Sequence, residues 1–310
     1  MNRREANGDA ESIRRRLRNE LRARGEDIGL GLQRYAIERL LYRLGRSRHR
    51  ERFILKGATL FAMWGTTYRP TRDIDFTGYG SSEARDVIDA FREICEAPDE
   101  VGALVFDTES ITAESIRDGS EYDGLRLKIR AHLGGSAITI QVDVGFGNAI
   151  VPGPEEREYR TILGDPVPRI LAYPPESVVA EKLHAMVILG ERNSRYKDFY
   201  DIHALATAFP FERSTLAAAV EATFARRVTP IPSEVPAALT AAYYASAPRA
   251  QQWRAYVTRN QLTGVSADFD HVGEVVISFL RPLWGDLSMG RAPSGDWPSG
   301  GPWRLAEAIT

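Results

Sequence analysis

The chain has 310 residues, with 40 Lys and Arg against 42 Asp and Glu, which gives a formal net charge of −2. This length suffices for two ordinary domains, and the near-neutral balance excludes a chain-wide positive field for nucleic-acid binding. The single cysteine, Cys95, excludes an internal disulfide and a cysteine-based zinc site, and it indicates a reducing compartment.

No stretch approaches the ~18 consecutive apolar residues of a membrane helix, and the N-terminus begins charged, without the apolar core of a signal peptide. We therefore expect a cytoplasmic protein without a membrane partner. Cys95 is expected to lie in the core, as unpaired cysteines usually do.

Two opening helices are predicted at residues 12–24 and 27–44, because apolar residues recur at helical spacing and Gly45 follows as a stop. Residues 1–60 contain sixteen Arg or Lys against eight Asp or Glu, so this segment is locally basic. A solvated helical surface is the commoner explanation for such a run.

An α/β layer follows. Short strands are predicted at residues 53–55 and 73–76, and each is followed by a helix, at 58–64 and 82–96. Further strands are predicted at 104–107, 125–131 and 137–144. The last two are separated by the turn 133–136, which suggests an antiparallel hairpin and therefore a mixed sheet.

The second half of the chain is predicted to be helical. Prolines break the pattern between residues 151 and 175, so we place a domain boundary near 172. The expected domains are 1–172 and a helical domain at 173–287. A flexible Gly/Pro/Ser-rich tail is expected at 288–310, ending in a short helix at 303–309.

Asp73 and Asp75 are the first candidate site residues. Alternate side chains of a strand share a face, so these two carboxylates project together and could share a metal ion. In the strand at 137–144 the apolar residues occupy one face, which leaves Asp143 on the other as a third candidate ligand. Taken alone, an Asp-x-Asp is more often an exposed strand edge.

The preceding segment, Lys56-Gly57-Ala58-Thr59, favours the metal interpretation. It reads as a strand, a glycine turn and a helix, the arrangement that turns backbone N–H groups toward a phosphate. Carboxylates beside such a turn suit a nucleoside triphosphate with two Mg²⁺ ions, and Asp143 could also take a proton from the attacking hydroxyl. Lysine is scarce, so its four positions draw notice: Lys56, Lys128, Lys182 and Lys197.

Lys182 lies beside the apolar stripe of a predicted helix, where it could reach a β- or γ-phosphate or be a surface lysine. Downstream, Asp198 and Asp201 are three residues apart and so adjoin on a helix. An ion pair of Arg195 with Asp198, or of Lys197 with Asp201, is one interpretation. The other has Asp198 orienting Lys182 or the nucleotide base. Spacing leaves both open.

As an ordered set, these residues resemble the AbiEii/AbiGii-type nucleotidyltransferase toxins, polymerase-β-like enzymes of bacterial abortive-infection and toxin–antitoxin operons. The resemblance implies a nucleotidyltransferase core, a C-terminal helical domain, Mg²⁺, a nucleoside triphosphate and a cognate antitoxin. It points to Asp73 and Asp75 as metal ligands, Lys182 on the triphosphate and Asp198 as the final motif carboxylate. The motifs that carry it are residues 55–59, 69–76, 122–126, 141–147, 180–182 and 193–201.

Some relatives add nucleotides to the 3′ end of tRNA, which would give the basic opening helices an RNA-facing purpose. Two positions depart from the pattern. Ala58 stands where many nucleotidyltransferases carry Ser, so a phosphate-bonding hydroxyl must come from Thr59 or be absent, and Asn148 stands where an acidic residue is expected.

Three alternatives remain at this point. An enzyme that modifies a small molecule, as aminoglycoside nucleotidyltransferases do, would not need the basic helices. An enzyme that modifies a protein would label protein instead of RNA. A non-catalytic binding module on the same fold would keep its toxicity after Asp73→Ala or Asp75→Ala.

Overall fold

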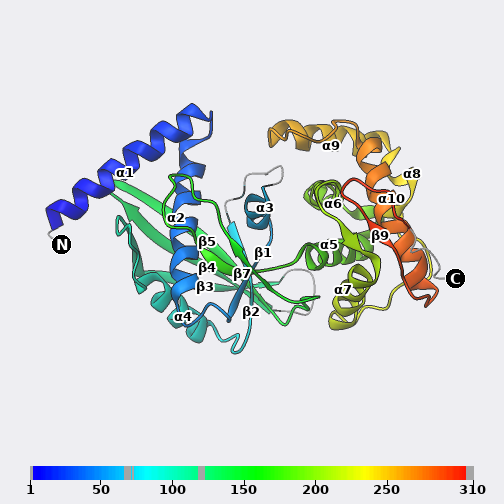
Figure 1. Cartoon of the computed structure of the whole chain (residues 1–310), viewed down its shortest axis with the longest axis horizontal. Helices are drawn as coiled ribbons and strands as arrows, with labels where there is room; N and C mark the ends of the chain where they lie inside the picture. The colour runs from blue at the N-terminus through cyan, green and yellow to red at the C-terminus, as the bar shows by residue number, and fades with distance from the viewer. Residues whose placement is uncertain (1–2, 66–70, 72, 118–122, 305–310) are drawn as a thin grey trace. The chain divides into compact units, whose positions relative to one another are not determined.

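The computed structural model describes residues 3–65, 71, 73–117 and 123–304 (Figure 1). It divides into two compact units. Among described residues, the first runs to Gly65, resumes from Thr71 to Gly147 and includes Glu155–Ala172, while the second holds Asn148–Pro154 and everything from Tyr173. None of the described helices combines the length and apolar character needed to cross a bilayer.

A seven-stranded sheet forms the centre of the first unit, in the order β3-β4-β5-β2-β1-β7-β6. β2 pairs in parallel with β5, and β1 with β7, while the other neighbours are antiparallel. The predicted mixed α/β sheet is thereby confirmed. The strands are β1 Phe53–Lys56, β2 Asp73–Gly78, β3 Leu104–Arg117, β4 Asp123–Leu133, β5 Ser136–Phe146, β6 Glu155–Glu158 and β7 Arg169–Ala172.

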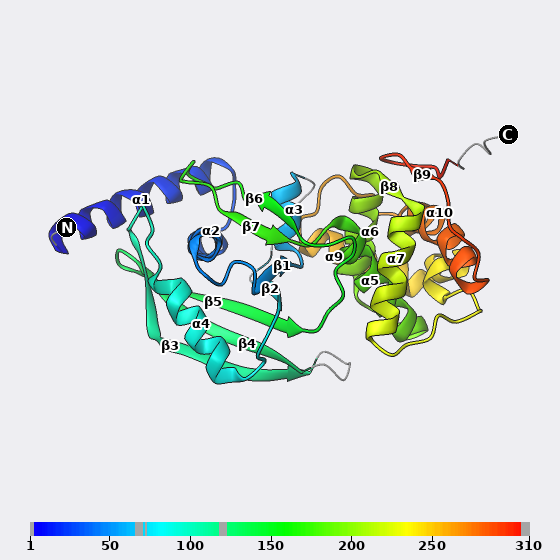
Figure 2. The same ribbon diagram turned by 60° about the horizontal axis from the view of Figure 1, so that its bottom comes forward.

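Helices α2 and α4 pack on one face of this sheet, as Figure 2 shows for α4 over β3–β5. α4 buries Val87, Phe91 and Ile94, which recur at helical spacing, and Cys95 is buried as expected. β4 alternates buried Leu127 with exposed Lys128, so the opposite face of the sheet is polar. The helices of this unit are α1 Arg3–Ala23, α2 Ile28–Arg46, α3 Thr59–Trp64 and α4 Ala84–Glu96.

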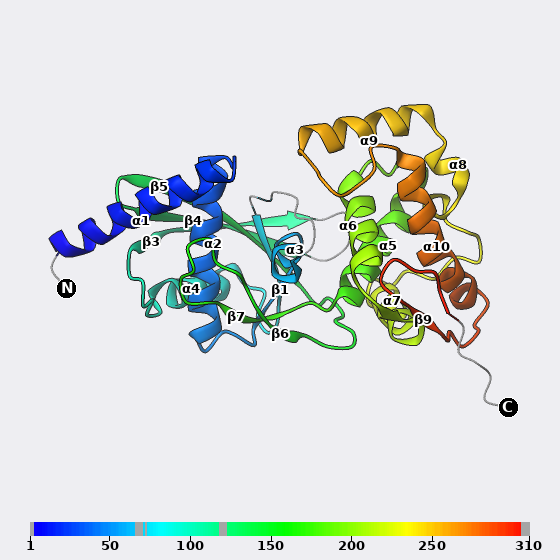
Figure 3. The same cartoon turned by 45° about the horizontal axis from the view of Figure 1, so that its top comes forward.

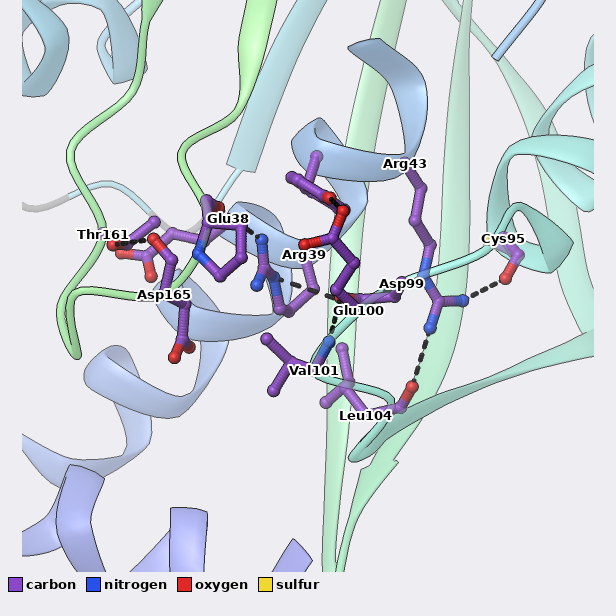
Figure 4. Close-up of polar contacts among 12 residues, drawn as sticks. Glu38, Arg39, Arg43, Cys95, Asp99, Glu100, Val101, Leu104, Thr161 and Asp165 are labelled. Carbon is purple, nitrogen blue, oxygen red and sulfur yellow. Dashed lines mark hydrogen bonds and ion pairs between the residues drawn. The ribbon is translucent and has the colours of Figure 1, made fainter. Parts of the chain in front are cut away.

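Two arginines of the basic opening segment are buried and do not contribute to its surface. The Arg39 and Arg43 side chains each lie 3.7 Å from Asp99 Oδ2, between α4 and β3. Figure 4 shows the Arg43 guanidinium reaching the carbonyl groups of Cys95 and Leu104. The expectation of a solvated helix surface is therefore wrong for these two positions. Their guanidinium groups hold α2 against the connection between α4 and β3.

Glu38 belongs to the same buried region. Its carboxylate accepts a hydrogen bond from the Ile162 N–H at 3.1 Å, and the Arg39 guanidinium donates to the Pro166 carbonyl at 3.0 Å. Burial raises the pKa of Glu38 from 4.5 to about 7, against the opposing effects of the Ile162 hydrogen bond and of the charge of Arg34. The side chain thus links α2 to the β6–β7 connection as a carboxyl group that titrates near neutrality.

Glu38→Gln is expected to remove a pH dependence of stability. Because the folded-state pKa is raised, the contribution of Glu38 is complete below pH 4.5 and is lost as the pH rises toward 7, at ~1.4 kcal/mol per unit, or on the order of 3 kcal/mol. Urea unfolding at pH 5 and pH 8 measures this slope. The variant should be less pH-sensitive than the wild type and than Glu51→Gln, an exposed control, and equal slopes would contradict the assignment.

The second unit is a bundle of helices (Figure 3), and aromatic side chains fill its core. Phe199 of α6 stacks on Tyr243 at 5.5 Å, and Phe269 of α10 stacks on Trp253 at 5.2 Å. α10 packs against α6 and α9. The elements are α5 Pro175–Leu189, η1 Gly190–Arg192, α6 Tyr196–Ala208, β8 Phe211–Glu212, α7 Arg213–Arg226, η2 Ala237–Leu239, α8 Ala241–Tyr244, α9 Ala247–Arg259, α10 Phe269–Ser288 and β9 Asp296–Trp297.

The segment after α10 packs onto the helices, where the sequence predicted a flexible tail. Trp297 is buried and donates its indole N–H to the Ala206 carbonyl at 2.7 Å. Trp303 donates to the Phe279 carbonyl at 2.8 Å and stacks on the Phe279 ring. Composition predicted flexibility, but two indoles supply enough apolar surface and hydrogen bonding to hold the segment. Most of the helix expected at 303–309 lies outside the described residues.

Candidate nucleotidyltransferase site

Four charged side chains form a row across adjoining strands of the sheet. Lys56 of β1 pairs with Asp75 of β2, Asp75 with Asp143 of β5, and Asp143 with Arg126 of β4. Residues paired directly across strands share a face, so all four belong to the polar face, away from α2 and α4. We call these four residues the charged row.

Asp73 lies in the next row along the strands. It pairs with Gln141 of β5, which in turn pairs with Lys128 of β4. The Thr71 hydroxyl donates a hydrogen bond to the Asp73 carboxylate. The structure therefore places Asp73, Asp75 and Asp143 at neighbouring positions on one face.

The Asp143 carboxylate is engaged by Arg126. The guanidinium Nε and Nη2 donate to the two carboxylate oxygens at 2.9 and 2.8 Å, and the Gln141 amide lies 3.3 and 3.4 Å from the same oxygens. This fork-like pair raises the pKa of the Arg126 guanidinium, chiefly through the hydrogen bonds to Asp143. Within the described part of the chain, no three His, Cys, Asp or Glu side chains are grouped closely enough to hold a metal.

Gly57 lies against Asp75 and leaves no space for a side chain. Its φ is +77°, and a Cβ built there would lie 2.1 Å from Asp75 Oδ2. Thr59, two residues on, has a buried hydroxyl that finds no hydrogen-bond partner among the described residues. A close backbone approach and a buried hydroxyl without a partner are both features of a turn that receives a polar ligand.

These residues fit a magnesium ion accompanied by a triphosphate. Mg²⁺ requires hard oxygen ligands and is usually held by one or two carboxylates together with substrate phosphates. Asp73 and Asp75 supply such a pair on one strand face, and Gly57 leaves the adjoining turn without a side chain. Asp73 and Asp75, together with phosphate oxygens, are therefore sufficient ligands for Mg²⁺ without a third carboxylate.

In the second unit, Lys182 of α5 is held by two buried carboxylates of α6. Its ammonium lies 2.9 Å from Asp198 Oδ1 and 2.6 Å from Asp201 Oδ2. Arg195 Nε contacts the other Asp198 oxygen at 2.8 Å. Both interpretations of this cluster are thus partly right, because Asp198 pairs with Arg195 and also orients Lys182. The alternative of an exposed surface lysine is wrong, since the Lys182 side chain is 14% exposed.

The charges of this cluster determine the ionisation of Asp198. Burial alone raises the pKa of its carboxyl group, but the positive charges of Lys182 and Arg195 outweigh burial and lower the pKa. Asp198 therefore remains ionised at neutral pH, and the Lys182 ammonium is fixed in position by a permanent counter-charge.

Asp198→Asn is expected to cost more stability than Asp201→Asn. Asp198 contacts the cations of both Lys182 and Arg195, at 2.9 and 2.8 Å, and Asp201 contacts Lys182 at 2.6 Å. Breaking a buried ion pair costs about 3–5 kcal/mol, which is the loss expected for Asp198→Asn. Loss of one charge-assisted hydrogen bond costs about 2 kcal/mol, which is the loss expected for Asp201→Asn. Urea unfolding measures both variants, with Glu191→Gln at an exposed ion pair as the control. The opposite order would show that Asp201 is the main anchor of Lys182.

Sequence reasoning did not identify two residues of these clusters. The sequence patterns assign no contact to Arg126 and pair Asp201 with Lys197, whereas in the structure Arg126 pairs with Asp143 and Asp201 with Lys182. Several positions of the sequence motifs lie outside the described residues: 69, 70, 72 and 122.

Comparisons with known proteins identify the family of the chain. The sequence model of the AbiEii toxin, a nucleotidyl transferase of type IV toxin–antitoxin systems, matches residues 39–275, which is more than half of the chain. No curated protein matches the chain. Similar solved structures include a predicted nucleotidyltransferase from H. pylori, 13% identical with a TM-score of 0.49 over 84% of this chain and 96% of the other.

A second structure, JHP933 from Helicobacter pylori, is 12% identical with a TM-score of 0.46 over 82% of this chain and 91% of the other. The family match covers the glycine turn, β2, β5 and the Lys182 cluster. It also implies a nucleoside triphosphate as co-substrate and an antitoxin as partner. The chain belongs to the AbiEii family of nucleotidyltransferase toxins of type IV toxin–antitoxin systems.

Proposed function

We propose that this enzyme is Mg²⁺-dependent and transfers a nucleoside monophosphate from a nucleoside triphosphate to RNA, with the 3′ end of tRNA as the acceptor. The observation that supports this best is the charged row, in which Asp75 lies between Asp143 and the strand that leads into the Gly57 turn. Because Gly57 has no side chain, the backbone of the turn lies against the Asp75 carboxylate. A phosphate bound by the turn and a metal ion bound by Asp75 would therefore be adjacent.

Asp73 and Asp75 would be the principal ligands of the metal in this proposal, and Asp143 would join them through the oxygen lone pairs that Arg126 does not use, once the ion draws the carboxylates together. Bound there, Mg²⁺ would neutralise the charge that develops on the phosphates during transfer. The turn would bind the triphosphate through its backbone, with the Thr59 hydroxyl available to a phosphate oxygen. The residues assigned to the triphosphate are Lys56, Gly57, Ala58, Thr59 and Lys182.

Asp143 is also proposed to accept the proton of the attacking hydroxyl, while Arg126 keeps its carboxylate oriented. The hydroxyl oxygen forms a bond to the α-phosphorus, and the bond from that phosphorus to the β-phosphate oxygen breaks, so pyrophosphate leaves. Asp198 would act on Lys182 as a positioning residue. We further propose a cytoplasmic location and neutralisation by a cognate antitoxin protein.

The test incubates purified protein with each labelled nucleoside triphosphate and total cellular RNA and protein. Label in RNA of tRNA size, prevented by EDTA, is the expected result. Label only in protein would overturn the RNA assignment, and EDTA-resistant labelling would overturn the metal requirement.

A further inference from the structure

A cavity of about 260 Å³ lies beside Asp73 on the side away from the glycine turn. It has the volume of roughly nine water molecules, enough for one sugar or base. A second cavity, of about 290 Å³, shares two of its residues and continues toward the start of α2. The first cavity is lined by Gln33, Asp73, Lys128, Thr139 and Gln141.

The strand order separates this cavity from the donor side of the site. β2 carries Asp73 and Asp75, with β1 and its Gly57 turn on one side, and β5 and β4 on the other. In phosphoryl transfer the attacking and leaving oxygens lie roughly in line, on opposite sides of the phosphorus. If the triphosphate binds at the turn, the attacking hydroxyl must approach from β5 and β4, where the cavity lies.

The lining of the cavity suits the end of an RNA strand. Gln33 donates its amide N–H to the Thr139 carbonyl at 3.1 Å, which fixes this side chain at the edge of β5. Amide and hydroxyl groups of Gln33, Gln141 and Thr139 can bond base edges and ribose hydroxyls, as proteins do at unpaired RNA ends. Lys128 supplies the cation that a phosphate requires.

Lys128 is available for such a contact. Its ion pair with Glu114 spans 3.7 Å and both side chains are more than half exposed, so the pair is weak and a phosphate can replace it. Arg126, by contrast, already donates two hydrogen bonds to the Asp143 carboxylate, at 2.9 and 2.8 Å. Arg130 follows two residues after Lys128 on the same exposed face, ~6.7 Å farther along the strand, in position for a second phosphate.

We propose that this cavity binds the 3′-terminal nucleotide of the RNA acceptor, with Lys128 on a backbone phosphate and Gln33, Thr139 and Gln141 around the sugar and base. This inference rests on the proposed function. It places recognition of the acceptor end on the polar face of the sheet and on Gln33 of α2, and not on the basic residues of the opening helices.

The first experiment measures binding without chemistry. A fluorescent single-stranded RNA with a free 3′ hydroxyl is titrated into wild type, Lys128→Gln and Arg85→Gln in EDTA without nucleotide. Arg85 is exposed on α4, which packs on the other face of the sheet, so both variants lose one surface charge. Lys128→Gln should bind about tenfold more weakly and show a salt slope smaller by about 0.7, the value for one phosphate contact on a single strand.

The second experiment locates the RNA end. An RNA with a 3′-terminal 4-thiouridine is cross-linked to the wild type, and the expected adduct lies in the tryptic peptide 131–157, which contains Thr139 and Gln141. Gln33→Ala, a second variant, should reduce this adduct severalfold. An adduct confined to α1 would overturn the proposal, as would equal binding by Lys128→Gln and the wild type.

Steady-state kinetics separates this inference from the proposed function. Lys128→Gln should raise KM for RNA and leave KM for the triphosphate unchanged, and the reverse would assign the cavity to the donor nucleotide. If the wild type labels RNA but Lys128→Gln behaves as Arg85→Gln, only the cavity assignment fails. If binding and cross-linking depend on Lys128 but no RNA is ever labelled, the proposed function fails and the cavity assignment stands.

Discussion

Asp75→Asn is expected to reduce nucleotidyl transfer by about 10³-fold, which corresponds to several kcal/mol of lost charge stabilisation in the transition state. The amide keeps the shape of the side chain but removes the charge that would neutralise a metal ion beside the Gly57 turn. The fold should be retained, because Asp75 is only partly buried and has Asp143 as its cross-strand neighbour. The measurement is the rate of label transfer from the preferred triphosphate.

The control for this variant is Asp89→Asn. Asp89 is exposed on α4 and pairs with Arg92, so it loses the same charge on the other face of the sheet. Its transfer rate should equal that of the wild type. A folded Asp75→Asn enzyme that transfers label at the wild-type rate would contradict the assignment of β2 as the metal-binding strand.

Gly57→Ala is expected to lower transfer by about 10²-fold and to cost about 1–3 kcal/mol of stability. Two effects combine, because the residue has φ of +77° and the added methyl would lie 2.1 Å from Asp75 Oδ2. Relief of this clash must displace the Asp75 carboxylate or the turn, and a shift of about 1 Å at reacting groups costs on the order of 10²-fold.

Gly80→Ala separates the two effects. Gly80 has φ of +80°, but a Cβ there would meet nothing within 4 Å. This control should lose about 1 kcal/mol to backbone strain and keep full transfer activity. Urea unfolding and transfer rates of both variants give the comparison. If Gly57→Ala behaves as Gly80→Ala does in both measurements, the close approach to Asp75 has no catalytic role.

One pairing of the charged row, that of Arg126 with Asp143, could have been found from the sequence. The predicted turn places Leu133 opposite Ser136. Seven residues farther from the turn on each strand, Arg126 therefore lies opposite Asp143. Alternation within single strands showed that Asp73 and Asp75 share a face, but the parallel pairing of β2 with β5 is a long-range contact. No local pattern in either strand specifies its neighbour, so the position of Asp143 beside Asp75 required the fold.

Tertiary partners explain what the sequence did not show. The periodicity of α2 gave its apolar stripe but could not show that Arg39 and Arg43 are buried, because their partner, Asp99, lies beyond α4. Similarly, Lys182 was compatible with a surface position until α6 supplied two carboxylates. Strand β3 was predicted at 104–107 but runs to Arg117, past a register shift that interrupts the alternation.

The most direct test is a crystal structure of the wild type with Mn²⁺ and a non-hydrolysable triphosphate analogue, in which anomalous scattering locates the metal. The account predicts Mn²⁺ bound to Asp73 and Asp75, with the triphosphate against the backbone of residues 57–59. A metal peak remote from both carboxylates, or a triphosphate bound elsewhere than at the glycine turn, would contradict it.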